Sequence, residues 1–203
     1  MEAYGEMPVH VATGTGWCAT NLEDQGDLSR DLYYYVVDSP LGPLFVGGSA
    51  AGVHHVAFLA GRDAEADCVA ALEREAGGAA ARDAASVSLV VAQLREYFAG
   101  ERERFELPLA ASGTEFQHRV WEALSRVPYG RTASYGEIAR AISRPSAARA
   151  VGAASRRNPL AIVVPCHRIV GADGALTGYG SGLHRKAWLL KQEARASRLG
   201  LAV

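Results

Sequence analysis

Charge is distributed unevenly along this chain, and the division falls near its middle. Residues 1–109 carry 7 Arg and Lys against 17 Asp and Glu, whereas residues 110–203 carry 14 against 5. The two halves therefore have net charges of −10 and +9, although the whole chain carries only −1. Halves of such opposite charge indicate two units with different roles, and the basic unit suits a polyanionic partner. A charge division without any partner is the alternative.

Arginine supplies most of the positive charge of the basic half, in which Lys186 and Lys191 are the only lysines. A guanidinium group forms paired hydrogen bonds with phosphate oxygens and also stacks on bases. The composition therefore favours nucleic acid over a membrane surface as the partner. Residues 1–10 lack the basic and then apolar pattern of a signal peptide. Three scattered cysteines do not suggest a disulfide framework. We therefore expect a cytoplasmic protein.

The acidic half is predicted to form a small α/β unit behind a flexible extension. The extension is expected over residues 1–30, which are rich in Gly, Thr and Asp and lack periodicity. Two amphipathic helices are expected, one around residues 68–75 and one over residues 87–98. Runs of apolar and β-branched residues predict strands at residues 32–37, 44–46, 53–59 and, at an edge, 105–109. We find no residues that indicate chemistry in this half.

The basic half is rich in helix signals. Thr114 with Gln117, and Ser134 with Glu137, have the spacing of capping boxes. The helix after Ser134 is expected to bury Ile138, Ala141 and Ile142. A third helix is expected over residues 146–156, after a tight turn. Two short helices joined by such a turn predict a helix-turn-helix, although any small helical domain can contain such a pair.

The third helix is thin because most of its side chains are small. Arg149 and Arg156 are seven residues apart and therefore share a face. A thin helix can approach another surface closely while its arginines reach beyond it; a tightly packed helix with solvated arginines is the alternative. The small residues are Ala147, Ala148, Ala150, Gly152, Ala153 and Ala154.

The candidate nucleophile lies at the end of an apolar run. The run ends at Pro165, whose fixed φ sets the direction of the chain before Cys166. A cysteine at such a turn becomes a nucleophilic thiolate when a base or a cation reaches its sulfur. Adjacent residues seldom meet face to face, so we expect His167 to act through a water molecule. A small core cysteine is the alternative. Zinc is disfavoured, since the only further Cys or His nearby is His184.

A glycine-rich loop and a helix follow this segment. The loop, residues 178–182, allows the backbone to approach a ligand closely. On the helix, a carboxylate at Glu193 would be able to orient a histidine, as the third member of a Cys-His-Glu relay. A partly exposed glutamate near a helix end is the alternative. The face expected to turn inward consists of Leu183, Ala187, Leu190 and Ala194.

Together, these motifs resemble those of the O6-alkylguanine-DNA alkyltransferase family. The resemblance covers roughly residues 110–195, with the motifs in order and at matching spacing, whereas the first half matches only in outline. Ser181 stands where the loop usually has a glycine, and the zinc-binding residues of some members are not evident. The matching motifs are Phe116-Gln117, Tyr135-Gly136, the run Ala147-Ala148-Arg149-Ala150-Val151-Gly152, Asn158-Pro159, Pro165-Cys166-His167-Arg168, Gly178-Tyr179, Leu183, Trp188, Leu189, Leu190 and Glu193.

The resemblance implies a fold and a function. It implies an α/β N-terminal domain of ribonuclease-H-like form over residues 31–109, and a mainly helical, winged-helix domain over residues 110–203. The implied activity is direct and irreversible transfer of an alkyl group from O6-alkylguanine in double-stranded DNA to a cysteine of the protein, once per molecule. O4-alkylthymine is a second candidate substrate. No diffusible cofactor or metal is implied, and we expect a monomer.

The resemblance also assigns roles to residues around the reaction. Cys166 is the implied alkyl acceptor. His167 takes its proton through water, Glu193 orients His167, and Asn158 holds the turn by side-chain hydrogen bonds. The guanine pocket is implied to be lined by Tyr179, Gly180, Ser181, Val164 and Pro165.

A second group of roles concerns DNA. Tyr135 is implied to rotate the target nucleotide outward, because an alkylated oxygen is unreachable inside the duplex. Arg149 is implied to fill the vacated place in the stack. The small residues Ala148 and Gly152 lie on the same DNA-facing helix.

Two other functions remain open on the sequence alone. A cysteine hydrolase with the same three side chains would turn over small esters without DNA. A helix-turn-helix regulator with a structural cysteine would bind one duplex sequence and keep its thiol unmodified.

Overall fold

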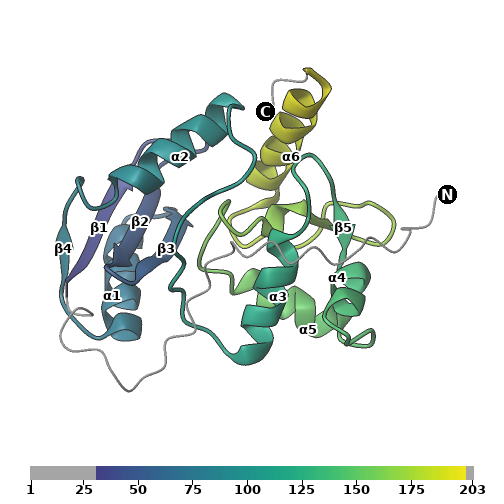
Figure 1. Cartoon of the computed structure of the whole chain (residues 1–203), viewed down its shortest axis with the longest axis horizontal. Helices are drawn as coiled ribbons and strands as arrows, with labels where there is room; N and C mark the ends of the chain where they lie inside the picture. Colours follow the sequence, from purple (N-terminus) through teal and green to yellow (C-terminus); the bar gives the residue numbers. More distant parts are fainter. Residues whose placement is uncertain (1–30, 200–203) are drawn as a thin grey trace.

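The computed structural model describes residues 31–199, and the side chains of residues 31–196. The extension expected over residues 1–30 lies outside the described residues. In the first half, a mixed sheet has the strand order β3-β2-β1-β4 (Figure 1). Antiparallel pairs join the first three strands, and β4 runs parallel to β1. The strands are β1 (Leu32–Val37), β2 (Leu44–Ser49), β3 (Gly52–Phe58) and β4 (Ala80–Arg82).

Alternation along β1 divides its side chains between two cores. Leu32 packs with Phe45 of β2 and with Leu72 of α1 (Ala64–Ala76), which covers one face of the sheet. Val37 belongs to the core on the other face, together with Leu94 of α2 (Ser88–Ala99). This second core continues into the basic half of the chain. The two halves are therefore packed on one another rather than joined only by a linker.

The second half is mainly helical (Figure 1). Both expected capping boxes are confirmed, at Thr114 and at Ser134, where each side chain accepts from a backbone N–H three residues later. A short 3₁₀ turn, η1 (Cys166–Arg168), leads into a two-stranded parallel pair that the sequence did not predict. The pair is β5 (Ala133–Ser134) with β6 (Ile169–Val170), and the helices are α3 (Glu115–Ser125), α4 (Tyr135–Ala141), α5 (Ala148–Arg156) and α6 (Leu183–Leu199).

Two expectations about these elements are wrong. The edge strand predicted over residues 105–109 is absent from the described structure, in which only Leu109 forms a bridge, with Val53. On α4, Ala141 is exposed and Ala139 takes its place in the core. Ile138 and Ile142 are buried as predicted, so only the middle member of the expected set is wrong.

The two halves meet at the β3 edge of the sheet. Val56 of β3 donates its N–H to the Pro159 carbonyl and accepts from the N–H of Ala161, both at 2.8 Å. The sheet therefore anchors the segment that leads to Cys166. Within residues 31–199, no helix has both the length and the apolar character needed to cross a membrane.

Candidate active site

The chain makes a constrained turn just before Cys166. Ile162 has φ of 72°, in the left-handed region that a β-branched residue rarely adopts. Such a conformation costs on the order of 1–3 kcal/mol and persists only where the surroundings enforce it. Burial of Leu160, Ile162 and Val164 provides that enforcement.

Asn158 holds the turn through both ends of its amide. Its Oδ1 accepts from the N–H of Leu160 at 3.0 Å. Its Nδ2 donates to the Val164 carbonyl at 2.9 Å and to Sγ of Cys166 at 3.2 Å. The sulfur is therefore fixed by a hydrogen-bond donor, which stabilises a thiolate more than a thiol.

His167 and Glu193 form a fully buried pair. Nε2 of His167 lies 2.8 Å from Oε1 of Glu193, and neither side chain is exposed. The Arg168 guanidinium also donates to both oxygens of this carboxylate, and the Gly130 N–H donates to Oε2. Glu193 is thus a buried charge with its hydrogen-bonding capacity used, as a carboxylate at this depth requires.

The environment sets the resting protonation of the site. Burial alone would raise the pKa of Glu193, but the hydrogen bond and charge of His167 and the charge of Arg168 hold that pKa at about 2. Burial lowers the pKa of His167 against the opposing effect of Glu193. Burial likewise raises the pKa of the Cys166 thiol, against the Asn158 hydrogen bond and the charge of Lys186. A neutral thiol and a neutral imidazole follow, so the thiol needs a base when it reacts.

The free nitrogen of the imidazole is available to be that base. With Nε2–H donating to Glu193, Nδ1 carries a lone pair, an assignment made from the hydrogen-bond network. Nδ1 of His167 is buried and bonds to no group in the described residues, Cys166 included. A proton moving from the sulfur to Nδ1 therefore needs an intermediary, and a water molecule remains the predicted one.

The buried face of α6 differs from the predicted one. It consists of Lys186, Leu189, Glu193 and Ala196, whereas Leu183 and Ala187 are exposed. The prediction followed apolar residues, but two of the four buried positions carry charged side chains. The spacing of these four still fits one helical face.

Lys186 is a site residue that the sequence analysis missed. Its Nζ donates to the Ile169 carbonyl and, at 2.6 Å, to the Thr177 carbonyl. It therefore joins the end of the Cys166 segment to the start of the glycine-rich loop. Its charge also favours the thiolate form of Cys166.

Tyr97 of α2 is a second missed residue, and it comes from the acidic half. Its hydroxyl donates to Oε1 of Glu193 at 2.8 Å and lies 3.4 Å from Nε2 of His167. Burial, and then Glu193, raise the pKa of this phenol well above its usual value. No signal in the sequence marked it, because the contact joins residues 96 positions apart.

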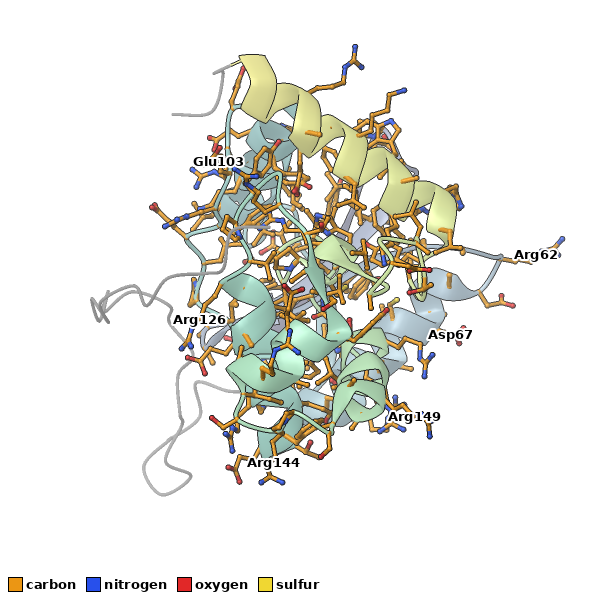
Figure 2. All side chains as sticks on the ribbon, turned by 90° about the vertical axis from the view of Figure 1, so that its right-hand side faces the viewer. Arg62, Asp67, Glu103, Arg126, Arg144 and Arg149 are labelled. Carbon is orange, nitrogen blue, oxygen red and sulfur yellow. The ribbon has the colours of Figure 1, made fainter. Side chains whose placement is uncertain are left out.

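The residues expected at DNA lie on and beside the α4–α5 pair. The Tyr135 hydroxyl reaches the carbonyls of Thr177 and Gly178, at 3.3 and 3.4 Å. Its ring borders Gly152, where an added Cβ would lie 3.5 Å from a ring carbon. Figure 2 shows Arg149 projecting away from the ribbon into open space. Ala148, beside it on α5, is half-buried.

The expected pocket residues are divided between two places. Tyr179 is partly exposed, but its hydroxyl is buried and bonds to no described residue. Gly180 is exposed, and the carbonyl of the half-buried Ser181 accepts from Arg185 at 2.8 Å. Val164 is fully buried. Pro165 lines a cleft of about 740 Å³, which also borders Arg168 and the segment of residues 103–109.

The structure thus brings Cys166, His167, Glu193 and Asn158 together, and leaves Arg149 outside on the surface. No cluster of three or more His, Cys, Asp or Glu side chains suited to a metal ion occurs between residues 31 and 199. The arrangement supplies a nucleophile, a base and a group that orients the base.

Comparisons with known proteins match both halves. Residues 32–111 match the ribonuclease-like domain of 6-O-methylguanine DNA methyltransferase, and residues 115–195 match its DNA binding domain. These matches confirm the predicted fold class. The methylated-DNA–protein-cysteine methyltransferase of Methanosarcina acetivorans is 47% identical over 162 residues, which are 80% of this chain and 98% of that protein.

Solved structures agree with this match. The crystal structure of Mycobacterium tuberculosis O6-methylguanine methyltransferase has a TM-score of 0.70 at 43% identity, over 81% of this chain and 94% of its own. The structure of M. tuberculosis OGT in complex with DNA has a TM-score of 0.69 at 42% identity, over 83% of this chain and 98% of its own.

Proposed function

This chain belongs to the methylated-DNA–protein-cysteine methyltransferase family, and we propose that Cys166 is its alkyl acceptor. The protein repairs DNA by moving an alkyl group directly from a damaged base to its own cysteine, as a methylated-DNA–protein-cysteine S-methyltransferase. The observation that carries the assignment to Cys166 is the hydrogen bond from the Asn158 amide to its sulfur. The residue that follows Cys166 in the chain is His167, which forms the buried pair with Glu193.

The proposed reaction is a displacement at the alkyl carbon of O6-alkylguanine. The thiol proton passes through water to Nδ1 of His167, while Nε2–H continues to donate its hydrogen bond to Glu193. The Cys166 thiolate forms the new carbon–sulfur bond as the carbon–O6 bond breaks, and the electron pair of that bond stays on guanine. The guanine then takes up a proton, which balances the one lost by the thiol. Thymine O4 offers the same carbon–oxygen bond and is the second candidate substrate.

We propose that the damaged nucleotide leaves the duplex before it reacts. Cys166 is only 7% exposed, so a base inside the stack does not reach its sulfur. Tyr135 is proposed to rotate the nucleotide outward, and the projecting Arg149 to fill its place. Small side chains at Ala148 and Gly152 let α5 approach the groove.

The extruded base is proposed to lie between the glycine-rich loop and the Cys166 segment. Tyr179, Gly180 and Ser181 would border it on the loop side, with Val164 and Pro165 behind the cysteine. The buried hydroxyl of Tyr179 supports this placement, because burial, and then the proximity of Cys166, raise the pKa of this phenol well above its usual value.

The remaining proposals concern the whole chain. We propose that residues 31–109 form one domain, and that residues 110–203 form the DNA-binding and alkyl-transfer domain. The proposed reaction uses only side chains of one monomer and no diffusible cofactor. A thiol that has to stay reduced suits the cytoplasm.

The proposal is tested with a duplex that contains one O6-methylguanine, mixed with the wild type, Cys166→Ser and Cys68→Ser. Cys68 is the other free cysteine of the described residues and lies on α1. Wild type and Cys68→Ser should restore guanine. Cys166→Ser should bind the lesion without repairing it, because a hydroxyl is far harder to ionise than a thiol. Repair by Cys166→Ser would overturn the assignment, and release of acid from small esters without DNA would favour the hydrolase.

A further inference from the structure

We propose that Tyr97 is a positioning residue of the alkyl transfer, supplied to the relay by the acidic half of the chain. Its hydroxyl fixes Glu193 so that Nε2 of His167 has to donate and Nδ1 is left as the acceptor. The inference rests on the proposed function of Cys166 and assigns a catalytic task to α2, on which the sequence indicated no chemistry.

The Tyr97 hydroxyl has one proton, and one acceptor lies clearly closer to it than the other. Oε1 of Glu193 lies 2.8 Å away, whereas Nε2 of His167 lies 3.4 Å away. The proton therefore goes to the carboxylate. Nε2 faces the same oxygen at 2.8 Å, and two acceptors at that distance would repel one another. Nε2 must then carry a proton of its own, which leaves Nδ1 free for the proton of the thiol.

Tyr97 is held rigidly enough to impose this arrangement. Its ring is fully buried and meets the rings of Phe98, Phe105 and Tyr129 at centroid distances of 5.6, 5.6 and 6.0 Å. Its carbonyl accepts from the Gln192 amide of α6 at 2.6 Å. In Figure 1 the C-terminal end of α2 points towards α6. The hydroxyl is thus fixed from both sides of the junction between the halves.

The Tyr97 hydroxyl should also affect how the reaction rate depends on pH. Tyr97 withdraws negative charge from Glu193, and that charge would otherwise stabilise protonated His167. Removal of the hydroxyl should therefore raise the pKa of His167. The other titratable or charged groups around the relay remain in place: Glu193 and Lys186 from α6, Tyr129 from the segment after α3, and Cys166 and Arg168 from η1.

The test compares Tyr97→Phe with Tyr33→Phe in the full chain. Tyr33→Phe also removes one hydroxyl that bonds to a protein oxygen, the Ser49 carbonyl at 2.9 Å, but on β1 and away from the relay. The probe is free O6-benzylguanine, and the readout is the benzyl mass gained on Cys166. The final fraction of benzylated protein measures how many molecules are folded, whereas the rate constant of benzyl transfer measures how well the relay works. A variant that is partly unfolded is therefore recognised by a lower final fraction.

We expect Tyr97→Phe to react about 10-fold more slowly, a part of the 10²–10⁴ that general base catalysis contributes. The acid limb of its rate profile should move to higher pH. Tyr33→Phe should match the wild type in both respects. In a Glu193→Gln background, Tyr97→Phe should add less than about a 2-fold loss, because the hydroxyl acts through that carboxylate.

Other results overturn the inference. A wild-type rate and pH profile for Tyr97→Phe would show that its hydroxyl only satisfies a buried carboxylate. An equal loss with and without Glu193, or a slower rate with an unmoved acid limb, would show a structural effect alone. If wild-type Cys166 gains no benzyl group, the proposed function itself fails, and this inference fails with it.

Discussion

At the scale of single residues, the site is organised around one buried carboxylate. Glu193 accepts hydrogen bonds from Tyr97, His167, Arg168 and the Gly130 N–H, and it is not exposed to solvent. Loss of one partner from such a buried network leaves the others without compensation, so its cost exceeds that of an exposed ion pair. The carboxylate therefore supports both the stability of the protein and the orientation of its base.

We expect Glu193→Gln to slow alkyl transfer about 100-fold, because the base then loses its orienting charge. The loss should be equal for methylated duplex and for free O6-benzylguanine, since Glu193 does not handle DNA. The matched control is Glu122→Gln, which changes an exposed carboxylate paired with Arg126 on α3. A loss confined to the duplex substrate would contradict this role.

Stability should depend on pH through the same network. In the folded protein the pKa of His167 lies below 6.5 and that of Glu193 lies near 2 instead of 4.5. Both values are depressed on folding, so both groups stabilise the fold at neutral pH and lose that contribution as the pH falls. The free energy of unfolding should decrease first below about pH 6.5, and again as the pH falls from 4.5 towards 2.

Urea unfolding between pH 2 and pH 8 measures this dependence. In Glu193→Gln the decrease between pH 4.5 and pH 2 should be smaller than in the wild type, by on the order of 3 kcal/mol. The Glu122→Gln control should retain the whole dependence. Parallel curves for the wild type and Glu193→Gln would show that Glu193 is not held in its charged form by the fold.

At the scale of elements, local signals predicted what local forces determine. Strand β1 and the capped starts of α3 and α4 follow from side-chain alternation and from residues three positions apart. The turn at Pro165 was also expected from the fixed φ of proline. The pairing of His167 with Glu193 was expected from the family resemblance and not from a local pattern. The helix predicted over residues 87–98 is confirmed as α2, which ends at the left-handed Gly100.

The missed features depend on contacts between distant parts of the chain. Strands β5 and β6 are two residues each and exist only because they pair with one another. Lys186 was not predicted to be buried, because the prediction placed only apolar residues on the buried face of α6. Its ammonium group is stable in the interior because it donates to two backbone carbonyls, which only the folded chain brings together. Tyr97 enters the site because the two halves pack together, which no local pattern shows.

Arg149, one of the two exposed arginines of α5, gives the prediction that belongs to this scale. We expect Arg149→Ala to slow repair of methylated duplex by about 10-fold or more, an estimate from the few kcal/mol that extrusion of a base costs. Reaction with free O6-benzylguanine should be unchanged, since no base leaves a stack. Arg62→Ala, an exposed arginine of the acidic half, is the control (Figure 2). Equal losses on both substrates would indicate damage to the fold or the pocket.

At the scale of the whole molecule, the opposite charges of the two halves do not separate two independent proteins. One core spans both halves, the edge of the first sheet anchors the Cys166 segment, and Tyr97 reaches the relay. Within the basic half, Arg168 donates to Glu193 inside the relay, whereas Arg149 lies on the surface, where we propose that it contacts DNA. The acidic half contributes Tyr97 to the relay and anchors the Cys166 segment through β3.

This division predicts how the protein binds undamaged duplex. Affinity should fall as salt rises, because contacts of arginine with phosphate release counterions. It should depend little on base sequence, because α5 offers few side chains long enough to read base edges. Fluorescence anisotropy with unrelated duplexes across a salt series measures both. Binding that ignores salt, or that is confined to one sequence, would contradict the prediction.

In the proposed reaction, the alkyl group ends on Cys166 and stays there. The thiolate of Cys166 is a very poor leaving group from the thioether that forms, so each molecule should act once. The direct measurement is a titration with excess O6-methylguanine duplex, followed by peptide mapping of the protein. We expect at most one repaired base per protein molecule, with the mass of one methyl group on the peptide that contains Cys166. Several repaired bases per molecule, or the methyl group on Cys18 or Cys68, would contradict it.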